Sequence, residues 1–324
     1  MSEIWTWAVL VTAVIAMLGF DMAFFGRRSQ EITFRSALVW SVAWATIGVA
    51  FVGVVWWLRG DAAAEEYLAG FVIEKSLSID NLFVFALIFS YFAVPLAQQR
   101  RVIFWGIVGA IILRGVFIFA GAALLDAFHW MVYVFGGFLV VTAIRMARHS
   151  EVEIHPEKNP ALRALRRVVP LTTEYHGDRF FVRVRGARTA TPLVAAFVLV
   201  ATFDVVFAVD SIPAIFAVTD DTFVVYAANA MSLLGLTALY FLLAGMLQRF
   251  QYLSLGLAVV LGFVGIKMLI SDVYTIPIAL SLVVIVLVLT VAIVWSLRSS
   301  RDEPDGQGDS DPAVTDEFVD GHSR

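Results

Sequence analysis

Long apolar segments dominate this sequence, and they limit the folds open to the chain more than any other feature. One of them, Ile278–Val294, is interrupted only by Ser281 and Thr290. Hydrophobic residues make up 60% of the chain and charged residues only 15%, against about 25% charged in an ordinary soluble domain. This composition excludes a soluble globular enzyme and a disordered protein. A β-barrel is disfavoured because its strands alternate apolar and polar residues. The sequence therefore predicts an all-α, polytopic membrane protein.

Several segments are long enough to cross a bilayer, which takes roughly 20 apolar residues of helix. We predict about nine transmembrane helices, at Ile4–Phe25, Phe34–Leu58, Tyr67–Val94, Val102–Leu125, Phe128–Met146, Ala190–Pro213, Phe223–Leu247, Tyr252–Ile270 and Ile276–Leu297. Lys and Arg gather in alternate loops, nine of them between residues 147 and 189. The loops between these basic ones carry mostly Asp and Glu. Because basic loops stay in the cytoplasm, the N-terminus is predicted to lie outside and the C-terminus inside.

Two pairs of segments in the chain resemble each other. Glu74–Asn81 and Asp204–Ser211 each hold an acid, five residues, an Asp and a small polar residue, at an offset of 130. Phe128–Met146 and Phe250–Met268 align at an offset of 122. Spans three to five therefore repeat as spans six to eight. A repeat of three spans must invert its copy, and inverted repeats are typical of transporters with a site near the membrane midplane.

These patterns divide the chain into six parts. They are two N-terminal helices (1–66), a first three-helix repeat (67–146), a basic cytoplasmic loop with short helices (147–189), a second three-helix repeat (190–271), a ninth helix (272–298) and a disordered acidic cytoplasmic tail (299–324).

Charged side chains inside the predicted spans point to function. They are the acids Glu74, Asp80, Asp204 and Asp210 and the cations Lys75 and Arg114. Such residues usually mark an ion path or a proton relay. The alternative is that they form ion pairs which hold helices together. Four acids against two cations leave an excess of two negative charges, which one divalent cation or two protons would balance, so we favour the ion-binding interpretation.

The neighbouring residues supply oxygen ligands. The predicted metal ligands are Glu74, Asp80, Asn81, Asp204, Asp210 and Ser211, with Lys75, Ser78, Arg114, Pro213 and Asn229 in supporting or proton-coupling roles. Carboxylate, amide and hydroxyl oxygens suit Mn²⁺, Ca²⁺ or Mg²⁺, and the absence of cysteine removes thiolate ligands.

Two of the supporting roles depend on helix geometry. Pro213 has no N–H, so the carbonyl of Val209 loses its helical partner and the helix is expected to bend or unwind there. Asn229 is equally well explained as a donor to the site or as an amide that pairs with a neighbouring helix.

Several of these segments resemble the TerC family. The matching segments are EKSLSIDNLFVF, FDVVFAVDSIPAIFAVT, NAMSLLGLTALYFLLAG, VGIKML and Leu113–Arg114, and they extend over spans three to nine. The resemblance implies bacterial inner-membrane proteins, named for tellurium resistance, that export manganese or aid metal supply to exported enzymes. It assigns Glu74, Asp80 and Asn81 to a first acidic motif, and Asp204, Asp210, Ser211 and Pro213 to a second. Thr237 departs from the family, which has an arginine at this position.

Together these features predict an inner-membrane transporter that exports a divalent cation by proton antiport, with Mn²⁺ as the expected ion. Proton coupling is expected because close carboxylates repel and at least one should hold a proton without metal. No nucleotide-binding motif or catalytic triad is present, so we expect neither an enzyme nor a permanently bound cofactor, and no nucleic-acid partner. Two alternatives remain. One is a membrane scaffold that recruits proteins through the 147–189 loop or the tail, and the other is a tellurite-stress protein without transport activity.

Overall fold

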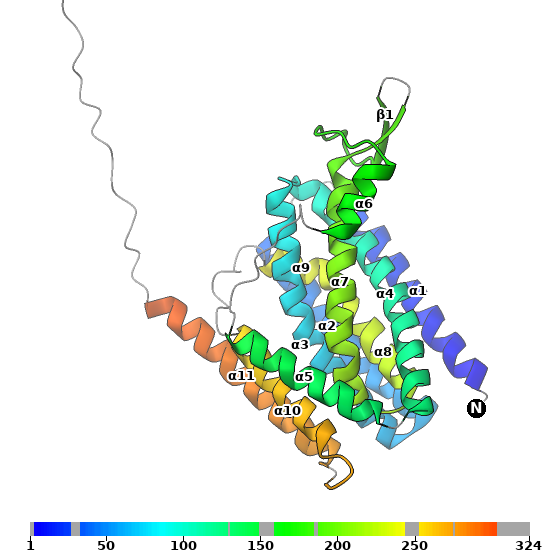
Figure 1. The fold of residues 1–324 in the computed structure, drawn as a ribbon, viewed down its shortest axis with the longest axis vertical. Coiled ribbons are helices and arrows are strands. Elements are labelled where there is room, and N and C mark those ends of the chain that lie inside the picture. The colour runs from blue at the N-terminus through cyan, green and yellow to red at the C-terminus, as the bar shows by residue number, and fades with distance from the viewer. Residues whose placement is uncertain are drawn as a thin grey trace, which may run out of the picture.

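The computed structural model describes residues 3–26, 33–128, 130–148, 159–184, 187–243, 253–274 and 276–302. Its elements are α1 (Glu3–Gly26), α2 (Phe34–Arg59), α3 (Asp61–Tyr91), α4 (Leu96–Ala127), α5 (Met131–Arg148), α6 (Pro160–Val168), β1 (Phe181–Val184), β2 (Ala187–Ala190), α7 (Pro192–Phe216), α8 (Thr222–Leu233), α9 (Leu236–Leu243), α10 (Leu253–Leu269) and α11 (Ile278–Asp302). The prediction of an all-α, polytopic membrane protein is confirmed (Figure 1).

The described helices can be compared with the nine predicted spans. By length and composition, six described helices can cross a membrane, and up to seven if α8 and α9 form one bent span. Helix α10 is shorter than these, and α3 carries several charged residues that lower its hydropathy. Each of the nine predicted segments overlaps one helix, or in one case the α8–α9 pair. The count of nine itself stays a prediction.

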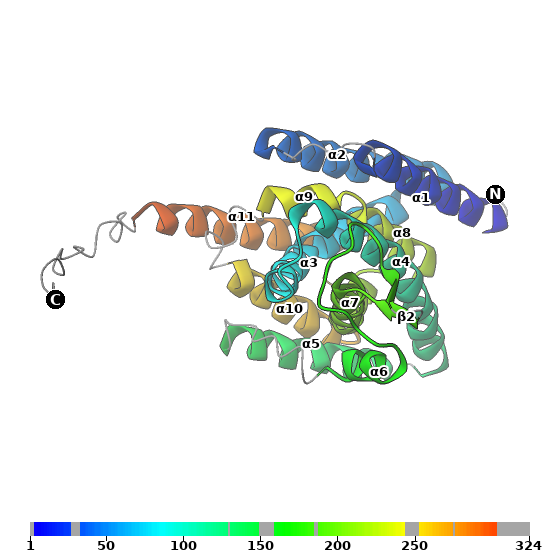
Figure 2. The ribbon, with the colours of Figure 1, turned by 90° about the horizontal axis from the view of Figure 1, so that it is seen from above.

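Helix α7 occupies the centre of the bundle, with α3, α4 and α8 packed around it (Figure 2). Helix α3 contacts α7 and α8, α4 contacts α7 and α8, and α5 contacts α10. This set of contacts is unchanged when α3 is exchanged with α7, α4 with α8 and α5 with α10. A two-fold axis between the predicted repeats would produce this pattern. The pattern is consistent with the repeat, which stays a prediction.

Helices α5 and α10 form the most extensive contact between described helices, and two glycines allow their close approach. A Cβ atom added at Gly136 would lie 3.0 Å from the carbonyl oxygen of Gly265, and one added at Gly265 would lie 2.9 Å from the carbonyl oxygen of Gly136. Backbones this close exclude larger side chains, as is common where membrane helices pack.

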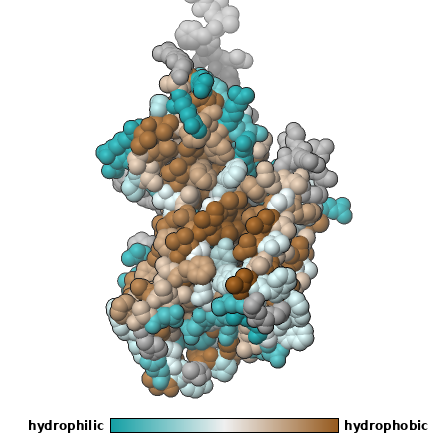
Figure 3. Space-filling model, turned by 90° about the vertical axis from the view of Figure 1, so that its right-hand side faces the viewer, coloured by the Kyte–Doolittle hydropathy of each residue, from teal (hydrophilic) through white to brown (hydrophobic). Residues whose placement is uncertain are grey.

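The surface is arranged as a membrane protein requires. On the face shown in Figure 3, hydrophobic residues gather over the middle and most hydrophilic residues lie toward the two ends. At one end, Arg59 pairs with Asp221 at 3.6 Å and Thr219 donates a hydrogen bond to Glu66 at 2.5 Å. Most of the described arginines lie toward the other end, including those of residues 159–184 and 187–190 (Figure 1). The predicted alternation of acidic and basic loops therefore has a counterpart in the fold.

Residues 159–184 and 187–190 form a cap over the basic end of the bundle (Figure 1). The Tyr175 hydroxyl donates to the carbonyl of Phe92 at the end of α3, at 2.6 Å. Burial raises the pKa of the Tyr175 phenol, so it keeps the donated proton. The guanidinium of Arg101 lies 5.5 Å from the centre of the Phe180 ring. We predicted a loop with short helices, and the cap also contains the antiparallel β1–β2 hairpin.

The helix does not unwind at Pro213, although unwinding was one of the two expected outcomes, and a bend there stays a prediction. Helix α7 continues through Pro213 to Phe216. Pro213 lies within the last turn, so the helix loses only one hydrogen bond there. The break occurs instead between α8 and α9, which meet at an angle of 44°. Gly235 at the break has φ +76°, a conformation that an α-helix cannot contain.

Candidate metal site

Arg114 lies at the centre of the polar cluster inside the bundle. It projects from α4 and is completely buried. Its Nη2 donates to Asp204 Oδ1 at 3.1 Å, and its Nε lies 3.5 Å from Asp204 Oδ2. Its Nη1 donates to Glu74 and lies 3.3 Å from Ser211 Oγ and 3.4 Å from Asn229 Oδ1. One guanidinium therefore joins α3, α7 and α8 to α4.

Two of the predicted acids share this one cation. Glu74 on α3 is 0% exposed and Asp204 on α7 is 3% exposed. Both form ion pairs with Arg114. Leaving a buried carboxylate without a cation costs several kcal/mol, which explains why the guanidinium is held so tightly. The ion-pair interpretation left open by the sequence therefore applies to Glu74 and Asp204.

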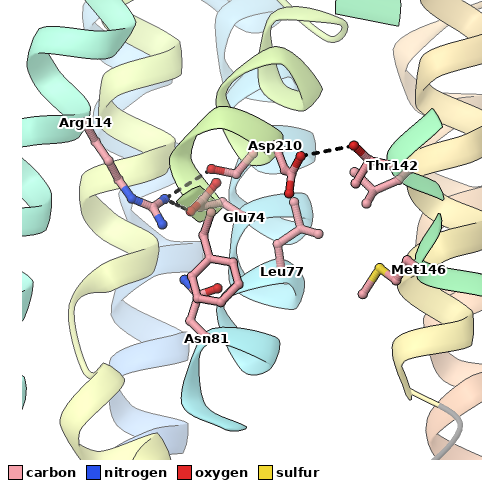
Figure 4. A pocket seen from close by; sticks show the side chains of 10 residues that line it. Glu74, Leu77, Asn81, Arg114, Thr142, Met146 and Asp210 are labelled. Atoms are coloured by element: carbon pink, nitrogen blue, oxygen red, sulfur yellow. Dashed lines mark hydrogen bonds and ion pairs between the residues drawn. The ribbon is translucent and has the colours of Figure 1, made fainter. Parts of the chain in front are cut away.

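A cavity lies beside this cluster and holds the third acid. Its lining includes Glu74, Leu77, Asn81, Arg114, Thr142, Met146, Phe207, Asp210, Ser211 and Leu261. Figure 4 shows Asp210 turned away from Arg114 and toward α5. There the hydroxyl of Thr142 lies 3.2 Å from Asp210 Oδ1. No ion pair to Asp210 occurs within the described part of the chain. The cavity thus has a side where two carboxylates share one guanidinium and a side where a carboxylate has no ion pair among the described residues.

Three buried polar atoms on α3 and α8 lack hydrogen-bond partners among the described residues. They are Glu74 Oε2, Ser78 Oγ and Asn229 Nδ2. Ser78 lies one helical turn after Glu74 on the same face of α3, as predicted, and is fully buried. Buried polar atoms normally have partners, so unpartnered oxygens on one helix face are suitable ligands for an ion or water. The described residues nevertheless contain no group of three or more His, Asp or Glu arranged to hold a metal ion.

Lys75 has a role that the sequence did not indicate. Its ammonium donates to the carbonyls of Ser232 at 2.9 Å and Leu234 at 3.2 Å. These carbonyls lie at the break between α8 and α9, where the helical partners are lost. Lys75 forms no ion pair with a described acid. Lys75, which follows Glu74 in the sequence, therefore stabilises the break between α8 and α9 directly.

The structure brings most of the predicted site residues together. Glu74, Asp204, Ser211 and Asn229 surround Arg114, and Asn81 and Asp210 line the adjoining cavity. The side chain of Asp80 lies outside the described part of the structure, so its predicted ligand role stays a prediction.

Sequence reasoning missed two residues with polar roles. Thr142 is the one threonine of α5 and stands between apolar residues, and no motif marks it. Asp21 in α1 is a further buried acid, 4% exposed, with Oδ1 unpartnered among the described residues. Its position within the first apolar segment was a readable signal.

The fold and site can now be compared with known proteins. Residues 59–303 match the family described as integral membrane protein TerC family. The chain belongs to the TerC family. The predicted resemblance is confirmed, and the match includes both acidic motifs, Arg114 and the cap.

Relatives resemble this chain over most of their length. It is 44% identical over 304 residues to an "Uncharacterized membrane protein STKORF319" of Myxococcus xanthus, covering 94% of this chain and 95% of the relative. It is 46% identical over 295 residues to the "Putative membrane-bound redox modulator Alx" of Escherichia coli K12, covering 88% of this chain and 92% of the relative. No solved structure matches the chain significantly.

Proposed function

We propose that this TerC family protein exports a divalent metal cation across the bacterial inner membrane, and that Mn²⁺ is its preferred ion. The observation that carries the proposal is the cavity inside the apolar bundle, lined by acids from α3 and α7. Intramembrane acids are costly to insert and are kept for function. Here Glu74 and Asp204 share a single guanidinium, that of Arg114, and Asp210 forms no ion pair with a described residue.

The chemistry of the donors supports a hard cation. Carboxylate, amide and hydroxyl oxygens bind Mn²⁺, Mg²⁺ and Ca²⁺ well, whereas thiolates, which favour softer metals, cannot occur in a chain without cysteine. The same absence excludes a thiol–disulfide couple on this chain as the basis of a redox role. In our proposal Asp210 receives the ion first, because its carboxylate has only a neutral hydrogen-bond partner. A proton on Asp210 would then be the exchanged ion.

The direct test is Mn²⁺ uptake into inverted membrane vesicles, in which export becomes uptake. We expect uptake by the wild-type protein and loss of uptake in Asp210→Asn. Glu65→Gln is the matched control, because Glu65 is an exposed acid on α3, away from the cavity. Equal uptake by the wild-type and Asp210→Asn proteins would refute the proposal. Matched assays with Ca²⁺, Mg²⁺ and Zn²⁺ would identify the ion.

The cap favours a second function, the recruitment of protein partners. Its exposed arginines are Arg163, Arg166, Arg167, Arg179, Arg183 and Arg188. A basic surface of this kind also follows from the positive-inside rule, so we rank this function second. A metal phenotype that survives Asp210→Asn but is lost when the cap arginines are replaced would favour recruitment over transport.

A further inference from the structure

Arg114 occupies the position from which a cation would contact the two acidic motifs. Its Nη1 is simultaneously the neighbour of Glu74, Ser211 and Asn229. These are the oxygens that a metal ion between α3, α7 and α8 would need. A metal–oxygen bond of about 2.0–2.6 Å requires the oxygens to converge on one point. The guanidinium and a divalent ion therefore cannot hold this position together.

Charge makes the exclusion stronger than shape alone. Arg114 remains protonated under all ordinary conditions. Like charges within a few ångströms repel strongly where water is excluded, and Arg114 is 0% exposed. A divalent ion that binds both Glu74 and Asp204 must therefore displace Arg114 from them.

The cavity provides a place from which this displacement can begin. Glu74 presents Oε2, an atom without a partner among the described residues, and Asn81 and Asp210 line the same cavity. Asp210 lies on the opposite side of the cavity from Arg114 (Figure 4). An ion can thus be held by Asp210 and Glu74 Oε2 while Arg114 still holds Asp204.

We propose that Arg114 is a tethered counter-cation that exchanges with the transported ion: it leaves Glu74 and Asp204 when the ion binds and returns to them when the ion departs. On its return Arg114 pairs again with both carboxylates of the empty site and competes with rebinding of the ion. This inference rests on the proposed function and adds the release step to it. Binding then carries the cost of moving Arg114, because only molecules with Arg114 displaced can bind the ion fully.

Equilibrium binding of Mn²⁺ to the purified full-length protein in detergent tests the exchange. If the displaced state makes up about 0.1–10% of molecules, Arg114→Gln should bind Mn²⁺ about 10- to 1,000-fold more tightly than the wild type. In vesicles the same variant should show a lower KM and a lower maximal rate, because the ion is no longer replaced. Arg59→Gln is the control, since Arg59 pairs with Asp221 at the acidic end. This variant should bind Mn²⁺ with the affinity of the wild type.

Added guanidinium separates exchange from a general charge effect. In Arg114→Ala, low guanidinium concentrations should lower the apparent Mn²⁺ affinity, and tetramethylammonium, which has the same charge without N–H donors, should not. If the Gln and Ala variants fail to fold, Arg114→Lys serves instead. Its single ammonium cannot reproduce the fork that joins Glu74 to Asp204, so it should also bind Mn²⁺ more tightly than the wild type.

The outcomes distinguish the two proposals. If the wild type binds Mn²⁺ and the Arg114 variants bind it equally or more weakly, the exchange is wrong and the proposed function stands. If neither the wild type nor any Arg114 variant binds a divalent cation, both are wrong.

Discussion

Glu74, Asp204 and Asp210 are all acids within the bundle, yet their surroundings differ. Glu74 and Asp204 are ion-paired with Arg114, and Asp210 accepts a hydrogen bond from the neutral Thr142 hydroxyl. Neutralising Glu74 or Asp204 should therefore lower stability more than neutralising Asp210. Removing one partner of a buried ion pair leaves the other charge less well compensated.

We predict that Asp204→Asn destabilises the protein by about 3–5 kcal/mol, as for other broken buried ion pairs. Asp210→Asn should cost about 1 kcal/mol or less, since Asp210 has one neutral hydrogen bond and no ion pair among the described residues, and Arg145 acts on it only from beyond ion-pair distance. Thermal unfolding of both variants in the same detergent measures the difference. Equal losses of stability would show that Asp210 has a charged partner after all.

Residue identity predicted much of this cluster, but not its pairing. Acids in apolar segments are conspicuous because of their insertion cost, so Glu74, Asp204 and Asp210 were identified from the sequence. Nothing in the sequence shows that Arg114 serves two of them and leaves the third. The partner of Lys75 could not be predicted either, because it consists of backbone carbonyls that any residues could supply.

Among the elements, the bent α8–α9 pair is the one that depends most on a single residue. Gly235 has φ +76°, and a Cβ atom added there would lie 2.3 Å from Cβ of Trp44. The sequence around it is apolar and continuous, so a straight helix was the natural prediction. The bend is imposed by the contact with α2 and by Lys75, which are both distant in the chain.

We predict that Gly235→Ala destabilises the protein by about 2–5 kcal/mol, the sum of left-handed backbone strain and overpacking. Gly137→Ala is the matched control. A Cβ atom at Gly137 meets nothing within 4 Å, so alanine should be neutral or stabilise α5 by up to about 1 kcal/mol. Thermal unfolding compares the two. A Gly235→Ala variant as stable as the wild type would mean that the break relaxes without cost.

At the scale of the whole molecule, charge divides the protein into a basic end with the cap and an acidic end with Asp221 and Glu66. Composition predicted this division through the alternation of loops. Composition could not predict that residues 159–184 and 187–190 form a cap, because a short amphipathic helix and a hairpin gain their stability from contacts with the bundle.

The orientation of these ends can be tested directly because the chain has no native cysteine. Single cysteines replace Arg167 in the cap and Glu65 at the acidic end, both exposed positions. We predict that a membrane-impermeant thiol reagent labels Arg167→Cys only in inverted vesicles and Glu65→Cys only in intact spheroplasts. The reverse labelling would invert the proposed topology, and with it the direction of transport.

The glycine contact between α5 and α10 also has a consequence for biosynthesis. Helix α5 ends at Arg148 and α10 begins at Leu253, so 253 − 148 = 105 positions separate the end of one from the start of the other. At roughly 5–20 residues per second, the ribosome needs about 5–20 s to make that length of chain. During this time α5 lacks its principal neighbour, and the surface at Gly136 that α10 covers in the folded protein stays unfilled. A nascent chain that stalls before α10 therefore displays an unfilled helix surface, by which membrane quality control can recognise it.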